Sequence, residues 1–204
     1  MVAVSLKKKQ REAVAMHEPK DNEVQIKMMA AGVCGSDIHI YKGENPNSRY
    51  PLIPGHENVG LVTKVGADCK NIKVGDHVVI DYVIRCGECY QCKHGRGNVC
   101  EHVLVRGSGT NGGWREYWCV EEPYVYKIDD SIPWKDAALI EPLTIGEHST
   151  SRAGVCDKVM AGEIFTDDDT DKNVVSKAAL VYSETVRNRE YQDYGRGKGG
   201  ALWS

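Results

Sequence analysis

The sequence of 204 residues lacks a long apolar run, a marked excess of one charge and an N-terminal signal-peptide pattern. A membrane-spanning helix takes about 18 or more apolar residues in a row, and no stretch approaches this. Lys and Arg number 26 against 29 Asp and Glu, so no basic surface for nucleic acid is expected. The short apolar start runs into Lys7, Lys8 and Lys9, unlike a secretory leader. These absences predict a cytoplasmic protein that binds neither membrane nor nucleic acid.

What the sequence does contain is cysteine, and half of its eight cysteines fall within residues 86–100, at Cys86, Cys89, Cys92 and Cys100. Thiolates separated by two residues can point into one tight turn, and a later cysteine closes a tetrahedron, the geometry of structural zinc. Disulfides or buried free thiols are the alternatives, but disulfides are rare in a reducing compartment. The spacing therefore predicts a structural zinc site with no open position for chemistry. Cys69, Cys119 and Cys156 have no partners at metal spacing and are interpreted as structural.

A second group of metal-binding residue types precedes the cysteine cluster. Cys34 offers a thiolate, His56 an imidazole and Glu57 a carboxylate, and a catalytic zinc needs about three such ligands plus an exchangeable position. Asp37 is placed to accept the other ring proton of the histidine. Each residue has an ordinary alternative: a buried apolar Cys34, a loop histidine, or Ser36 or Asp37 capping a short helix over residues 38–41.

Several segments, in one order from about residue 23 to about 154, resemble the medium-chain zinc alcohol dehydrogenases. Residues 55–69, GHENVGLVTKVGADC, look like that family's zinc-binding signature, and residues 86–100 are similar to its structural zinc lobe. Three shorter segments agree with them: VGDHV at 74–78, GGWREY at 112–117 and IEPL at 140–143. Within the family the chain looks closer to the polyol branch, because Glu141 stands where simple-alcohol enzymes usually have a cysteine ligand.

The resemblance implies a catalytic zinc as well as a structural one. Cys34 and His56 would be zinc ligands, Glu57 a ligand or near-ligand, and Glu141 would bind directly or through the bound water. Ser36 and His39 resemble the path by which the alcohol proton leaves, and a near-neutral imidazole pKa suits a relay. Ordinary turn structure is the alternative for this pair. The implied reaction is oxidation of an alcohol or polyol by hydride transfer to NAD or NADP.

Alternating apolar and polar residues predict a mainly β fold. Strands are expected over residues 23–28, 58–65, 76–82, 114–120 and 124–128, separated by glycine-bearing turns. One helix is expected over residues 133–146, with Ser131 as its N-cap. This pattern indicates a small, partly open antiparallel barrel, and the resemblance implies a GroES-like catalytic domain.

Beyond residue 154 the resemblance lapses where the family continues into a doubly wound nucleotide-binding domain. About fifty residues remain, so no complete Rossmann domain is expected. The expected organisation is a GroES-like domain over 1–155, a return segment of that domain over 156–184 and a flexible tail over 185–204. Two functions stay open: a truncated zinc-dependent polyol dehydrogenase, or a zinc-binding module unable to bind the nicotinamide cofactor. Without the nucleotide-binding domain, the active-site surface would expose apolar area. This predicts self-association.

Overall fold

The computed structural model describes residues 2–5 and 10–152. The return segment and tail expected over 156–184 and 185–204, and Cys156, lie outside these residues. A two-stranded ribbon pairs β1 (Val2–Ser5) with β2 (Gln10–Ala13), and a second ribbon pairs β6 (Val83–Ile84) with β7 (Leu104–Val105).

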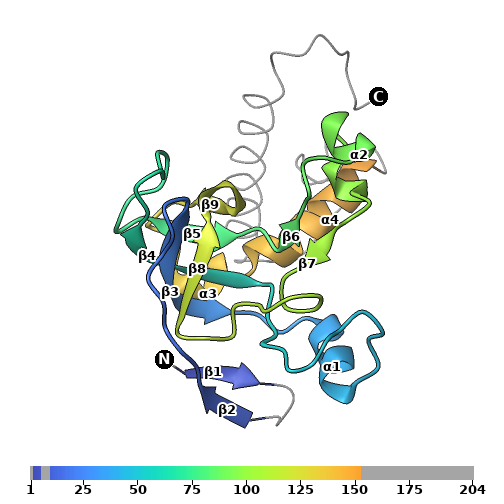
Figure 1. Ribbon diagram of the computed structural model, residues 1–204, viewed down its shortest axis with the longest axis horizontal. Coiled ribbons are helices and arrows are strands. Elements are labelled where there is room, and N and C mark those ends of the chain that lie inside the picture. Colours follow the sequence, from blue (N-terminus) through green and yellow to red (C-terminus); the bar gives the residue numbers. More distant parts are fainter. Residues whose placement is uncertain (1, 6–9, 153–204) are drawn as a thin grey trace, which may run out of the picture.

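The main sheet has five strands in the order β8-β3-β4-β5-β9, and every neighbouring pair is antiparallel (Figure 1). Two register shifts between β3 and β4 bend the sheet, as bulges do. Strand β4 has the expected bounds, β3 runs three residues further than expected, and the remaining strands begin later than expected. Their bounds are β3 (Glu23–Ala31), β4 (Asn58–Val65), β5 (His77–Ile80), β8 (Tyr117–Glu121) and β9 (Val125–Lys127).

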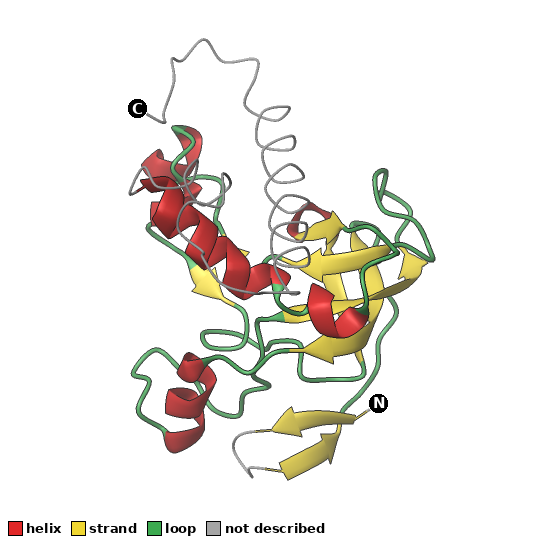
Figure 2. Cartoon of the chain, turned by 180° about the vertical axis from the view of Figure 1, so that it is seen from behind, coloured by secondary structure: helices red, strands yellow, loops and turns green. Residues whose placement is uncertain are grey.

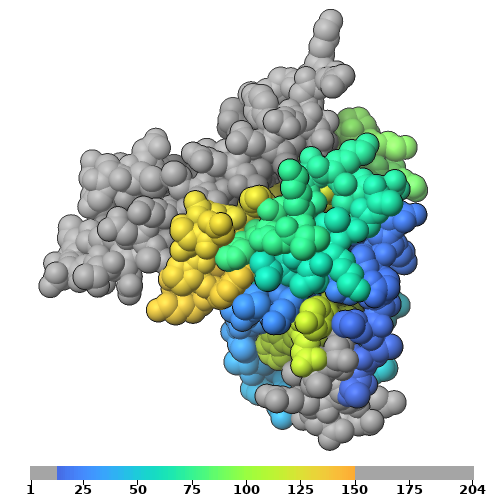
Figure 3. Space-filling view, turned by 90° about the vertical axis from the view of Figure 1, so that its left-hand side faces the viewer, coloured from blue at the N-terminus to red at the C-terminus, as the bar shows by residue number. Residues whose placement is uncertain are grey.

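Both faces of the sheet are buried, which the period of two along β5 makes clear. Val78 and Ile80 point into a core that also contains Val24, Ile26 and Trp118. Val79, between them, points to the other face and packs with residues of the C-terminal helices. On the face that Figure 3 shows, segments from the early, middle and late parts of the described residues lie next to one another.

The helical segments are short and lie around the sheet (Figure 2). The expected single helix over 133–146 is wrong: α3 ends at Ala137, a separate helix starts at Ile140, and Pro133 rather than Ser131 is the N-cap of α3. A continuous helix would place Pro142 in its interior, against the carbonyl four residues earlier, whereas the first turn of a new helix tolerates it. The helices are α1 (Gly35–Lys42), α2 (Tyr90–Lys93), η1 (Gly97–Val99), η2 (Glu122–Tyr124), α3 (Trp134–Ala137) and α4 (Ile140–Arg152).

Among the described residues, no helix combines the length and the apolar character that crossing a bilayer requires. The fold matches the expected mainly β class with short helices.

Candidate metal centres

The cysteine lobe, residues 86–100, brings its four thiols together. Their sulfur atoms all lie within 4.8 Å of one another. The Sγ–Sγ distances are 3.5 Å for Cys86–Cys100, 3.9 Å for Cys86–Cys92 and 3.9 Å for Cys89–Cys100. Zn–S bonds of about 2.3 Å give a regular tetrahedron with S···S edges of about 3.8 Å. The lobe therefore has the dimensions of a closed four-thiolate zinc site.

Backbone amides in the lobe and just after it hold the sulfur atoms in place. Cys89 N–H donates to Cys86 Sγ at 3.3 Å, and Cys86 N–H and His102 N–H donate to Cys100 Sγ, each at 3.4 Å. A hydrogen bond from the Cys92 amide, with another from Glu101, lowers the pKa of Cys89 to about 6. Donors of this kind stabilise the thiolate, the form that binds metal, and orient it as outer-shell partners do.

Strand pairing assembles the second site, for which we use the name mixed-ligand site: Cys34, His56 and Glu57. In the antiparallel pair β3–β4, Ala31 lies opposite Asn58, so the residues just after β3 meet the residues just before β4. The Gly32 N–H donates to the Glu57 carbonyl at 2.8 Å and extends this pairing beyond the strands. As a result, one donor atom from each of the three residues lies within 4.8 Å of the others.

Asp37 connects two of the three residues of the mixed-ligand site. Its Oδ2 accepts the Cys34 N–H at 2.9 Å. The helix α1 thus begins earlier than the alternative over residues 38–41, with Cys34 as its N-cap and Asp37 at its third position. The Asp37 Oδ1 lies 3.6 Å from His56 Nδ1, and both side chains are largely buried. Burial of His56 lowers its pKa, but the nearby carboxylate of Asp37 outweighs this and raises it to about 9. With Nδ1 facing Asp37, Nε2 remains for a metal.

The other two donors of the site have shifted pKa values as well. Burial raises the pKa of the Cys34 thiol, but hydrogen bonds from Ser36 and His56 outweigh this and lower it overall. Burial raises the pKa of Glu57. The lack of a side chain at Gly32 leaves space for this carboxylate, because a Cβ at position 32 would lie 1.9 Å from Glu57 Oε2. Sequence patterns did not identify this requirement.

Glu141 lies at the start of α4, buried, and outside the triangle of closest donors. Burial raises its pKa to about 7, while the charge of His56 opposes the shift and that of Glu57 adds to it. Tyr82, which no sequence motif singled out, contributes to the same surroundings. Its ring centroid lies 5.3 Å from that of His56, and it interacts with Glu141, whose charge adds to the burial that raises the Tyr82 pKa to about 12.

Ser36 and His39 both lie on α1, three residues apart and therefore on neighbouring positions of one helix face. Ser36 lies close enough to Cys34 to lower the pKa of its thiol, which places it beside the mixed-ligand site. His39 points to solvent at the far side of this face, with Nδ1 2.7 Å from Glu44 Oε2. Both side chains of this ion pair are more than half exposed.

Comparison with known protein families gives one decisive match. The alcohol dehydrogenase GroES-like domain matches residues 20–130, more than half of the chain. The chain belongs to the medium-chain zinc alcohol dehydrogenase family. This dehydrogenase domain contains every residue of the two metal centres except Glu141, which follows eleven positions beyond the matched range.

Known relatives agree with this family assignment. The starvation-sensing protein RspB of Escherichia coli is 38% identical over 153 residues, which cover 74% of this chain and 45% of RspB. Sorbitol dehydrogenase of Bacillus subtilis is 36% identical, and the match covers 69% of this chain and 41% of that enzyme. A crystal structure of the Escherichia coli rspB protein with NADH matches with a TM-score of 0.69 and 35% sequence identity. The match covers 74% of this chain and 45% of the rspB chain. The chain thus spans less than half the length of these relatives.

The residues present fit zinc at both centres of this family member. Four thiols at tetrahedral spacing suit a structural ion, and a thiol, an imidazole and a carboxylate leave a fourth position open. Cys119, interpreted from its spacing as structural, lies in a further donor group with His17 and Glu23. Sequence spacing could not identify this group, because its three members come together only in the folded sheet.

Proposed function

We propose that residues 20–152 are the zinc-binding catalytic part of a dehydrogenase that oxidises a secondary alcohol or polyol with NAD or NADP. The observation that carries the proposal is the mixed-ligand site, in which three donors of different type converge beside two further buried acidic side chains, Asp37 and Glu141. Relatives named sorbitol dehydrogenase and L-threonine 3-dehydrogenase, the latter from Pyrococcus furiosus, support an alcohol substrate.

Each residue of the site has a role in this proposal. Cys34 and His56 would hold the ion, and Asp37 would fix the ring of His56. Glu57 is a third ligand or near-ligand, and Glu141 binds directly or through water. A zinc ion held there acts as a Lewis acid that lowers the pKa of a bound alcohol.

The proton of the alcohol has an exit along α1. Ser36, beside Cys34, would accept it and pass it toward His39, which lies three residues further along α1 and has an exposed side chain. Glu44 would then hold the resulting imidazolium, since its carboxylate lies 2.7 Å from Nδ1. The exposed pair is suited to exchange the proton with water.

A second function remains: a zinc-loaded module that does not transfer hydride by itself. In the part of the chain that the structure describes, all paired strands of the sheets are antiparallel, so no βαβ unit is present there to bind a dinucleotide. We favour this function for the 204-residue polypeptide in isolation. A second protein segment or chain would then supply the cofactor-binding site.

NADH binding to the purified, zinc-loaded chain separates the two functions. Calorimetry or nicotinamide fluorescence would show saturable binding if a cofactor seat forms, for instance between copies of the chain. The second function predicts no saturation while both zinc equivalents remain bound. A saturating NADH signal that persists in dilute monomer would overturn it.

We also propose that the surface beside α4 is covered by protein in the active assembly. Leu139 and Ile145 are about half exposed there, at 46% and 54%. Such exposed apolar area favours association. Sedimentation velocity of the chain should therefore show a sedimentation coefficient that rises with concentration, and a constant monomer value would contradict this.

A further inference from the structure

A third group of metal-binding side chains lies at the β8 edge of the sheet, and we call it the edge cluster: His17, Glu23 and Cys119. One donor atom from each residue lies within 4.8 Å of the other two. The mixed-ligand site has its donor atoms within the same distance of one another and contains the same three donor types, a thiol, an imidazole and a carboxylate.

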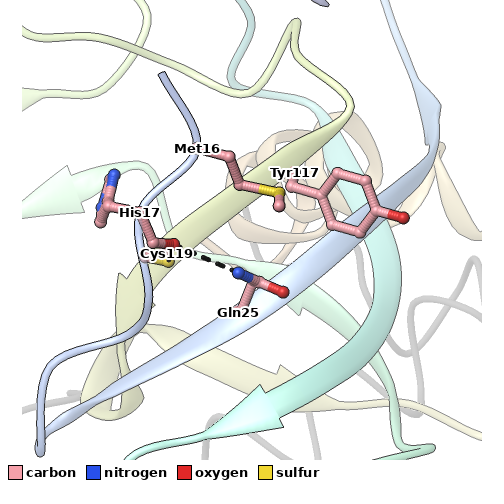
Figure 4. A pocket seen from close by; sticks show the side chains of 5 residues that line it. All are labelled: Met16, His17, Gln25, Tyr117 and Cys119. Carbon is pink, nitrogen blue, oxygen red and sulfur yellow. Dashed lines mark hydrogen bonds between the residues drawn. The ribbon is translucent and has the colours of Figure 1, made fainter. Parts of the chain in front are cut away.

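The register of the sheet produces the cluster. Gln25 of β3 lies opposite Cys119 of β8, so Glu23, two residues away on β3, projects from the same face as Gln25 and is the diagonal neighbour of Cys119. The segment before β3 then passes over this face. Its His17 carbonyl accepts the Gln25 Nε2–H at 3.2 Å, as Figure 4 shows, and the Cys119 Sγ–H at 3.5 Å. Two contacts therefore hold His17 in place.

The carboxylate of the edge cluster is preoriented. Glu23 has a side chain only 8% exposed, and the Lys20 N–H donates to its Oε2 at 3.1 Å. An amide donor of this kind orients a ligating carboxylate as outer-shell partners do. The Lys20 Nζ lies 3.3 Å from Oε1, but this side chain is 77% exposed and can move into solvent when a cation takes its place.

The thiol of the cluster is partly buried and neutral at ordinary pH. Burial, followed by the charge of Glu23, raises the pKa of Cys119. A cation that binds must release this proton, as zinc does at cysteine ligands. Met16 lines the same small pocket, but its sulfur points toward Tyr117 rather than toward Cys119 (Figure 4). The thioether therefore stays outside the donor set.

We propose that the edge cluster is a third metal site of this chain, selective for Zn²⁺ or a similar borderline cation. Magnesium and calcium prefer oxygen ligands alone, whereas a thiolate, an imidazole and a carboxylate are the ligands that zinc takes. His17 is exposed, so solvent can reach the cluster. A bound ion would fasten the segment that carries His17 to β8, which lies at the edge of the five-stranded sheet.

Zinc titration in the presence of a chromophoric chelator, followed by elemental analysis after desalting, tests the proposal. The wild-type chain should bind one equivalent beyond those of the cysteine lobe and the mixed-ligand site. Cys119→Ser and His17→Ala should each lose this equivalent alone. Cys69→Ser is the matched control, because Cys69 also donates to backbone carbonyls near Glu23 but belongs to no donor group among the described residues.

The outcomes are distinct from those for the proposed function. A wild-type chain that saturates at two equivalents would overturn the third site, and so would a third equivalent that persists in both variants. His17→Ala keeps the test valid if Cys119→Ser fails to fold, because His17 is exposed and contributes its backbone carbonyl to the packing contacts. Loss of the extra equivalent with unchanged NADH behaviour would support the third site whichever of the two functions holds.

Discussion

The cysteine lobe and the mixed-ligand site hold metal-binding residues by opposite means. The lobe takes four identical ligands from residues 86–100, and backbone amides of residues 86–102 donate to their sulfur atoms. The mixed-ligand site takes residues from just after β3 and just before β4, and it faces Glu141 from α4. The ligands of the lobe are close in sequence and leave no coordination position for a substrate. The ligands of the mixed-ligand site are distant in sequence and leave one position free.

This difference separates stability from chemistry. A local, four-thiolate centre has little structure of its own without the ion, so binding free energy there is folding free energy. The mixed-ligand site rests on a sheet that buries an apolar core on each face, and burial of apolar surface stabilises a sheet without a metal. Loss of its ion should therefore leave the fold and remove the chemistry.

The largest expected effect is that of Cys89→Ser in the lobe. We expect this substitution to remove one zinc equivalent and to lower the melting temperature more than a substitution in the mixed-ligand site does, because three thiols no longer close the tetrahedron. Elemental analysis and thermal unfolding measure both effects. Cys69→Ser serves as the control for a lost thiol, and an unchanged zinc content in Cys89→Ser would contradict the lobe assignment.

His56→Ala tests the other side of the comparison. The variant should lose the zinc of the mixed-ligand site and any dehydrogenase activity, while it keeps the zinc of the lobe and most of its stability. Elemental analysis paired with thermal unfolding separates the two centres. A variant that lost both ions together would show that the centres are coupled, and the contrast between them would fail.

The same contrast explains what the sequence could predict. The spacing of Cys86, Cys89, Cys92 and Cys100 was enough for the lobe, since nothing distant contributes a sulfur atom. Alternation in β3 and β4 predicted the sheet, and family resemblance brought Cys34 and His56 together. Tyr82, Gly32 and the edge cluster were missed because they depend on strand register and on contacts between distant segments, which spacing along the chain does not encode.

Asp37→Asn sharpens the comparison within the mixed-ligand site. The amide can still accept the Cys34 N–H through its oxygen, but it loses the charge that faces His56 Nδ1. Outer-shell substitutions of this kind lower metal affinity by about 10- to 100-fold. Chelator competition should show this loss for one zinc equivalent only. Asp129→Asn is the control, because Asp129 accepts a backbone N–H at an exposed turn in the same way.

Gly32→Ala should have the smallest effect and the most specific one. A Cβ there would lie 1.9 Å from Glu57 Oε2 and 3.0 Å from Glu57 Cβ, so the carboxylate must move although no ligand is removed. We expect zinc affinity at the mixed-ligand site to fall by about 10-fold or less, in the lower part of the range for displaced outer groups. Gly35→Ala is the matched control, since its Cβ would meet nothing within 4 Å. Chelator competition on the two variants decides between the roles of Glu57: equal affinity would show that this carboxylate stands beside the ion without binding it, and a loss confined to Gly32→Ala would show that it contributes.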